Sequence, residues 1–295
     1  MKRTMIKGID VSSHDNFNGE QFKANTESCY RDSDFVIVKA TQGVTYIHRQ
    51  CDAIINRCKA DGKLWGFYHY AGGNDPIAEA EFFYNQCRGY FGNGIPCLDW
   101  ESIGNKSWGN STWCRKFVDK IHELAGVWCL IYVQASGRSQ AANCANDCGL
   151  WVAGYPDNRN SWDIPRFCYK CSPWETYTIW QYSSSNEKTD RNTSPLTRDQ
   201  WAAIAEGEKM AISNDDANTV WAFNNYGKGG HSSAWANVID TNLRLQAVQV
   251  QLTALSEAVK TLAEHKGADP EAVAKAVSDA VAAKLEQIKI TVDAN

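Results

Sequence analysis

Two acidic residues at the end of an apolar segment are the first feature of this sequence that could do chemistry. Asp99 and Glu101 close the strand-like segment Ile95–Glu101. Side chains alternate along a β-strand, so residues two apart point to the same side, roughly 6–7 Å from each other. Two carboxyl groups held this close oppose each other's ionisation, which makes one of them a usable general acid near neutral pH. The spacing predicts an acid–base pair, although an exposed charged loop carries the same short pattern.

Two further carboxylates stand near the ends of other strand-like segments. Asp10 lies at the end of Ile6–Val11, and Asp190 follows eight residues after the end of Thr178–Tyr182. In a β/α barrel the reactive groups lie at the carboxyl ends of the strands. Asp10, Asp99, Glu101 and Asp190 are therefore expected at one mouth. Together they would supply the protonated and the ionised carboxyl group that cleavage of a glycosidic bond requires.

The elements that must position these groups alternate between strand-like and helix-like segments. Short apolar runs rich in β-branched and aromatic residues predict strands at Ile6–Val11, Phe35–Ala40, Leu64–Tyr70, Ile95–Glu101, Val127–Val133, Leu150–Tyr155 and Thr178–Tyr182. Helices are predicted at Arg49–Asp61, Ile77–Tyr90, Ser111–Ala125 and Ser136–Asn146. This alternation predicts parallel strands with crossover helices. The expected fold class is α/β, an irregular, TIM-like β/α barrel, with an open doubly wound sheet as the alternative.

Charge, hydropathy and motifs exclude several classes of function. The net charge of −4 argues against nucleic acid as the main partner, which would need a basic surface. Membrane insertion is not expected, because no apolar run approaches the roughly 18 residues of a spanning helix. No apolar signal core follows Lys2 and Arg3. Neither a dinucleotide-binding G-x-G-x-x-G nor a zinc-binding H-E-x-x-H is present, so no cofactor and no metal are expected.

The 11 cysteines all lie between Cys29 and Cys171. An odd number cannot pair completely within one chain. Buried or free thiols in a protein made in a reducing compartment are the favoured interpretation. Disulfides, or a zinc site formed by Cys144, Cys148, Cys168 and Cys171, remain alternatives.

Six segments, taken in order, resemble glycoside hydrolase family 25, the Chalaropsis-type lysozymes found in phage lysins and in some bacteria and fungi. The resemblance covers roughly residues 5–200. Its carriers are Lys7-Gly8-Ile9-Asp10-Val11-Ser12, Phe35-Val36-Ile37-Val38-Lys39-Ala40-Thr41-Gln42-Gly43, Gly66-Phe67-Tyr68-His69-Tyr70, Leu98-Asp99-Trp100-Glu101, Leu150-Trp151-Val152-Ala153 and Trp180-Gln181-Tyr182. The family usually closes with a longer loop before its last acidic residue; here the closing unit reads Asp190-Arg191-Asn192.

The resemblance implies a hydrolase that cleaves the β-1,4 bond between N-acetylmuramic acid and N-acetylglucosamine in bacterial peptidoglycan. Under this hypothesis Glu101 protonates the leaving oxygen and Asp99 supports the developing positive charge. Asp10 and Asp190 maintain the electrostatic environment of the site and keep the sugar in position. Tyr68, Tyr132, Trp151 and Gln181 are the expected substrate-binding residues, although core packing explains the three aromatic residues equally well. A glycan-binding or virion-structural protein on an inactive barrel, and a chitinase-like hydrolase, are the alternatives.

The missing signal core fits a phage lysin that is made in the host cytoplasm and acts at the cell wall. This location is an inference from the family.

The last part of the chain differs in character from the first. The sequence predicts a catalytic domain over 1–207, a polar linker over 208–235, and a helical region over 236–295 for oligomerisation or wall targeting. Apolar residues at alternating three- and four-residue steps predict a coiled coil and hence a homo-oligomer. The members of this stripe are Val238, Leu245, Val248, Leu252, Leu255, Val259 and Leu262. A helical hairpin packed on the barrel is the alternative.

Overall fold

The computed structural model describes residues 5–185, 188–207 and Asp269. The chain divides into two units, Met1–Asn225 and Tyr226–Asn295, and apart from Asp269 the described residues belong to the first. The predicted linker over 208–235 lies outside the described residues. The predicted helical region over 236–295, with its coiled coil, lies outside them too apart from Asp269, so these expectations stay predictions.

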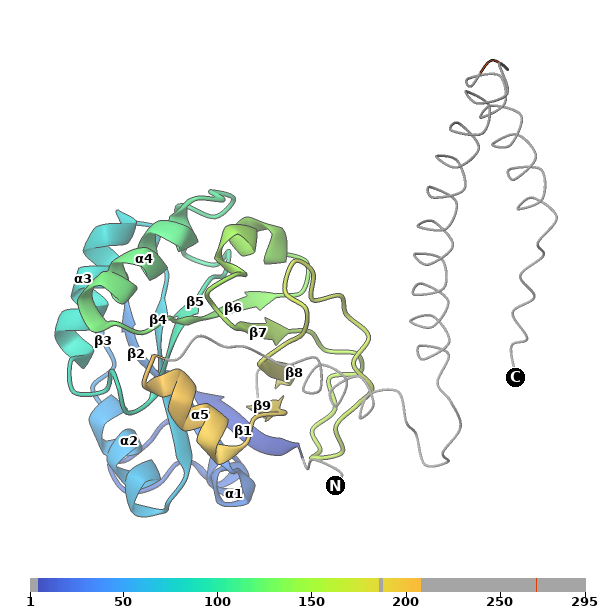
Figure 1. Ribbon diagram of the computed structural model, residues 1–295. Helices are drawn as coiled ribbons and strands as arrows, with labels where there is room; N and C mark the ends of the chain where they lie inside the picture. The colour runs from blue at the N-terminus through green and yellow to red at the C-terminus, as the bar shows by residue number, and fades with distance from the viewer. Residues whose placement is uncertain (1–4, 186–187, 208–268, 270–295) are drawn as a thin grey trace. The chain divides into compact units, whose positions relative to one another are not determined.

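In the described part of the chain eight strands close into a barrel, and a ninth, the two-residue β3, pairs there with β2 alone (Figure 1). The order around the barrel is β1-β9-β8-β7-β6-β5-β4-β2, and β1 pairs with β2 to close it. All neighbours in the barrel are parallel except β9, which runs antiparallel to both β1 and β8. The strands are β1 (Ile6–Val11), β2 (Phe35–Gln42), β3 (Tyr46–Ile47), β4 (Leu64–Tyr70), β5 (Ile95–Asp99), β6 (Leu130–Gln134), β7 (Leu150–Ala153), β8 (Ile179–Ser185) and β9 (Lys188–Ser194).

Helices follow several of the strands and cover the outside of the barrel (Figure 1). The third begins at an Asp75 cap that accepts the backbone N–H groups of Ile77 and Ala78, and the fourth ends at Gly126 in the left-handed conformation. The described helices are α1 (Ala24–Asp32), α2 (Cys51–Ala60), α3 (Pro76–Cys87), α4 (Trp113–Ala125) and α5 (Arg198–Ala205), with 3₁₀ helices η1 (Ser13–Asp15) and η2 (Arg138–Cys144).

The expected α/β barrel is confirmed as a closed mixed barrel, but it departs from the regular TIM pattern. The strand β9 runs against its neighbours, and the long connection from β7 to β8 contains no helix among the described residues. The helix predicted at Ser136–Asn146 is instead a kinked 3₁₀ segment, with a non-helical backbone at Ala141. The sequence patterns did not predict α1, β9 or α5.

The barrel interior is apolar at the end where the parallel strands begin. Alternation sends every second residue inward, and a Cβ atom on Gly8 would lie only 2.1 Å from the ring of Phe35. Glycine at this position therefore makes room for the phenylalanine. Trp201 of α5 packs on Phe35, with ring centroids 4.9 Å apart. The members of this apolar floor include Phe35, Ile37, Ile95, Cys97, Leu130, Ile179, Trp201 and Ile204.

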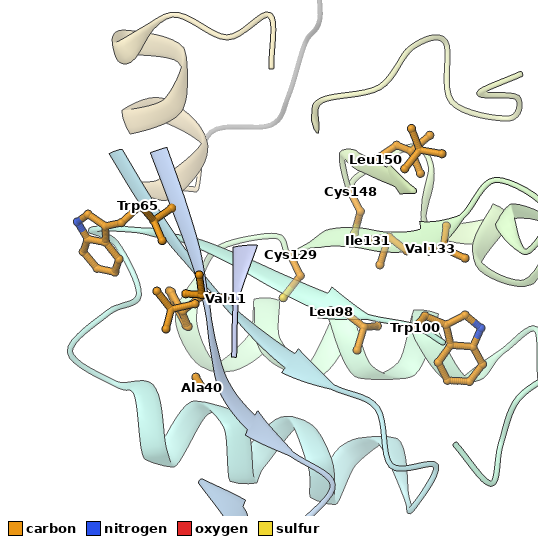
Figure 2. Close-up of a cluster of buried hydrophobic side chains, with 14 of the residues drawn as sticks. Val11, Ala40, Trp65, Leu98, Trp100, Cys129, Ile131, Val133, Cys148 and Leu150 are labelled. Atoms are coloured by element: carbon orange, nitrogen blue, oxygen red, sulfur yellow. The ribbon is translucent and has the colours of Figure 1, made fainter. Parts of the chain in front are cut away.

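The alternate residues of the same strands point outward and pack beneath the helices. Figure 2 shows part of this outer layer, with Leu98 and Trp100 of the β5 segment close to Ile131 and Val133 of β6. Ten of the 11 cysteines are buried as free thiols, and Cys168 is exposed. The burial agrees with the interpretation of these residues as small core side chains.

Replacing Trp201 with alanine is expected to lower the free energy of unfolding by about 3–5 kcal/mol, because the side chain fills the floor of the barrel. The indole is 2% exposed and its Nε1 donates to the carbonyl of Trp65 at 3.1 Å. Urea denaturation measures the change. Ala202→Ser, on the exposed side of the same helix, is the control and should change stability by less than about 0.5 kcal/mol. Equal stability of the two variants would contradict the assigned role of Trp201.

Candidate active site

A cavity of about 800 Å³ opens where the parallel strands end. All four predicted carboxylates line it: Asp10, Asp99, Glu101 and Asp190. The expected substrate-binding residues line it as well: Tyr68, Tyr132, Trp151 and Gln181. The structure thus brings together every residue that the sequence assigned to the site. Their catalytic and binding roles stay predictions.

Asp10 and Asp190 are direct neighbours across two antiparallel strands. The register of β1 and β9 pairs the Cα atoms of these two residues. Like charges directly opposite each other on a sheet repel. Burial, followed by the charge of Asp10, raises the pKa of Asp190 well above its ordinary value. Asp190 is therefore positioned by β9, a hairpin strand that runs back toward the floor of the barrel, and not by the end of a parallel strand.

Asp10 is held by two amide side chains. Gln181 Nε2 donates to Asp10 Oδ2 at 2.8 Å, and Asn192 Nδ2 donates to the same oxygen at 2.6 Å. Burial raises the pKa of Asp10 to about 6, and these two hydrogen bonds oppose the rise because they favour the ionised form. The amides are oriented in turn: Trp151 Nε1 donates to Asn192 Oδ1 at 2.8 Å, and the hydroxyl of Tyr132 donates to Gln181 Oε1 at 2.8 Å.

Asp99 and Glu101 face the cavity from the same strand end. Trp100 between them points outward, where its Nε1 donates to Gln140 Oε1 at 2.9 Å and its ring stacks on that of Trp113. Asp99 is 6% exposed, and its Oδ1 has no hydrogen-bond partner among the described residues. Burial and the charge of Glu101 raise the pKa of Asp99 well above its ordinary value. Burial also raises the pKa of Glu101, which Tyr132 and Lys39 oppose.

Lys39 is a site residue that the sequence patterns did not single out. It lines the cavity from β2, and its Nζ donates to Gln42 Oε1 at 2.8 Å. Burial lowers the pKa of Lys39, while the charges of Asp99 and Glu101 oppose that change. A lysine two residues after Ile37, on the same face of an apolar strand, was the available signal. Asn192 and Tyr155 were missed as well.

The aromatic residues expected to bind sugar are mostly buried. Trp151 is 2% exposed, and its ring meets that of Tyr132 edge-on with centroids 4.5 Å apart. Packing and hydrogen bonding therefore account for much of their surface. Tyr155, in contrast, is 37% exposed and its hydroxyl donates to Gln181 Oε1. Its ring is therefore more accessible to a sugar than the rings of the buried aromatic residues.

A buried histidine cluster supports the loops around the cavity. His69 Nε2 lies 2.8 Å from Glu79 Oε2, and the hydroxyl of Thr41 lies 2.8 Å from His69 Nδ1. Burial lowers the pKa of His69, which keeps the ring neutral. The carboxylate of Glu79 also accepts the backbone N–H groups of Gly72 and Asn74, at 2.9 Å and 2.6 Å. This cluster fixes the loop that follows β4.

The loop after β4 in turn holds the loop that follows Glu101. The backbone N–H of Lys106 donates to the carbonyl of Gly72 at 3.2 Å, and the hydroxyl of Ser107 donates to that of Gly73 at 2.9 Å. Gly73 has φ +79, and a Cβ atom there would lie 2.4 Å from the nitrogen of Lys106. Only glycine permits this approach without strain. His69 and Glu79 therefore act as positioning residues behind the carboxylates.

No group of three or more potential metal ligands is arranged to hold an ion among the described residues. Likewise, none of the helices in the described part of the chain has the length and apolar character needed to cross a membrane.

Asp99→Asn is expected to stabilise the folded protein at pH 7 by an amount on the order of 1 kcal/mol, at the expense of activity. The raised pKa of Asp99 means that the unfolded chain releases its proton more readily than the folded one. That difference destabilises the wild type above the unfolded pKa, and it disappears below about pH 4, where both states are protonated. Thermal unfolding of both proteins at pH 7 and at about pH 3.5 measures it; a gain that persists unchanged at low pH would contradict this cause.

Comparison with known proteins shows which family the chain that carries these carboxylates resembles. The chain is 29% identical over 181 residues to an autolytic lysozyme of Clostridium acetobutylicum, a match that covers 61% of this chain and 51% of that protein. The chain thus spans about half the length of this relative. It is also 29% identical over 205 residues to an N,O-diacetylmuramidase of Chalaropsis sp., covering 61% of this chain and 89% of the relative.

The fold has a matching solved structure. A family GH25 lysozyme from Aspergillus fumigatus superposes with a TM-score of 0.55 at 24% identity, over 69% of this chain and 100% of that one. The sequence profile of the glycosyl hydrolases family 25 matches residues 9–191, a span that contains all four carboxylates. The resemblance drawn from the ordered motifs is thereby confirmed, and the chain belongs to glycosyl hydrolases family 25.

Proposed function

We propose that the barrel domain is a lysozyme that hydrolyses the β-1,4 bond between N-acetylmuramic acid and N-acetylglucosamine in bacterial peptidoglycan. The observation that carries this proposal is the gathering of four carboxyl groups with raised pKa values around one open cavity. Glycosidic cleavage requires one carboxyl group to be protonated while another is ionised. Membership of the family and the names of the two relatives support the choice of substrate.

Glu101 is the proposed general acid. It is the more exposed member of the Asp99–Glu101 pair, which lets it reach the leaving oxygen of a bound glycan. The rise in the pKa of Glu101 through burial favours the protonated form that this role needs. The positive charge of nearby Lys39 disfavours the protonated form of Glu101 and therefore limits the rise in its pKa.

Asp99 and Asp10 are proposed to act on the positive charge that develops on the sugar. Asp99 would support it directly or orient the 2-acetamido group of the sugar as an internal nucleophile, a known variant of the two-carboxylate scheme. The two amides that donate to Asp10 favour its ionised form, which suits electrostatic stabilisation. Asp190, opposite Asp10, would help to hold the sugar in register.

Glu101→Gln is expected to lower kcat on purified peptidoglycan by about 100-fold or more while glycan binding is kept, because the amide cannot donate the catalytic proton. Release of reducing ends measures turnover, and sedimentation with insoluble wall measures binding. Glu123→Gln, an exposed position on α4, is the control and should leave both unchanged.

The same assay on chitin separates this proposal from a chitinase-like hydrolase. Cleavage of chitin in place of peptidoglycan would contradict the proposed substrate, and wild-type activity in Glu101→Gln would contradict the proposed acid.

The chain is proposed to consist of three parts: the catalytic domain over 1–207, a linker over 208–235 and a separate helical segment over 236–295. We further propose an endolysin-type enzyme that acts at the bacterial cell wall. The heptad spacing from Val238 to Leu262 supports self-association. Several barrels on one stalk would bind a repeating polymer with avidity.

The full chain is therefore expected to be an oligomer at micromolar concentration, and a chain ending at Gly207 a monomer. Multi-angle light scattering on both gives their masses. Finding the full chain monomeric would contradict self-association through this segment.

A further inference from the structure

A second hollow, of about 340 Å³, lies beside the catalytic cavity. We propose that it binds the peptide stem of the glycan strand and that Arg49 pairs with a carboxylate of that stem. This inference rests on the proposed lysozyme function and extends it to the substrate's peptide part. The hollow is lined by Ser13, Asn16, Phe17, Tyr46, Ile47, His48, Arg49 and Gln50.

The hollow and the catalytic cavity share a wall. In the segment around η1, Ser12 and His14 line the catalytic cavity, while Ser13 and Asn16 line the hollow. On the other side, Lys39 of the cavity has its Nζ 5.4 Å from the ring centroid of Tyr46 in the hollow. A branch on a sugar bound in the cavity therefore has only a short distance to cross.

The two sites differ in charge. Four carboxyl groups and two cations, Lys39 and Arg138, line the catalytic cavity, whereas the described residues that line the hollow include one arginine and no carboxylate. Arg49 is exposed, and its guanidinium has no hydrogen-bond or ion-pair partner among the described residues. An arginine fork binds carboxylates through paired, charge-assisted hydrogen bonds. The hollow, with a cation and no carboxyl group in its described lining, is the more favourable of the two sites for an anionic branch.

The remaining lining fits a short peptide. Ile47 is 47% exposed in the hollow and offers an apolar contact for alanine methyl groups. His48 Nδ1 donates to the carbonyl of Lys39 at 2.9 Å, which leaves Nε2 as an acceptor for a peptide N–H. Burial lowers the pKa of His48, in agreement with the neutral ring.

The chemical groups of peptidoglycan indicate which of its two parts, the sugars or the peptide stem, fits the hollow. Its sugars are uncharged, whereas the stem joined to the lactyl group of N-acetylmuramic acid carries carboxylates, amide groups and methyl side chains. Each of these three groups has a counterpart in the hollow: Arg49, His48 and Ile47. The stem is therefore the part of the substrate that the hollow fits.

Arg49→Gln tests the proposal on two substrates, both freed of teichoic acid: strands with intact stems, and strands from which an amidase has removed the stems and whose exposed lactyl carboxylates are then capped as methylamides. We expect KM for stem-bearing strands to rise about tenfold, the loss of one charge-assisted hydrogen bond, with kcat unchanged. KM for stem-free strands should stay the same. Arg31→Gln, an exposed arginine in the last turn of α1, is the matched control and should alter neither value.

A binding measurement keeps this test separate from the test of the activity. Muramyl dipeptide is titrated by calorimetry into Glu101→Gln and into the Glu101→Gln, Arg49→Gln double variant, with weaker binding expected for the second. Equal binding, or an equal change in KM on both substrates, would overturn the stem site. If the wild type cleaves neither substrate, the proposed function fails, whereas the calorimetric difference still reports on Arg49.

Discussion

Four carboxyl groups share one mouth with the half-buried Lys39, and each of them resists ionisation where it lies. Burial is the largest cause in every case, and neighbouring charges add to it for Asp10, Asp99 and Asp190. Such an arrangement costs stability, so the surrounding structure must hold the groups together. Lys39 and the amides of Gln181 and Asn192 offset part of that repulsion. The remaining imbalance favours the protonated forms, which is the condition that the proposed general acid needs.

The rest of the domain provides the rigid frame that this crowding requires. Below the carboxylates, Phe35 and Trp201 fill the barrel with apolar side chains, so the strands cannot collapse inward. Behind them, the buried His69–Glu79 pair ties the loop after β4 to the loop after Glu101. Burying such a pair is costly unless its hydrogen bonds are satisfied. Thr41 and the backbone N–H groups of the loop after β4 satisfy them here.

The site was more predictable from the sequence than the frame around it. Alternation along one apolar strand identified Asp99 and Glu101 as residues that share a side, because the period of two is strict. Asp10 and Asp190 were expected from their places near the ends of other strand-like segments. The closing strand β9 escaped notice because Lys188–Ser194 is polar and lacks an apolar alternation. The helix α1 starts at Lys23 without a side-chain cap, and its sequence is mostly polar. Asn192 could not be identified as a partner of Asp10, since their 182-residue separation hides the contact.

Both ends of the described domain lie at the floor of the barrel. The first strand starts there at Ile6, and Gly207 packs against the carbonyl of Gly126, just before β6 begins at the same end. Ile6 and Gly207 therefore both lie at the end of the barrel away from the cavity, and neither obstructs its opening.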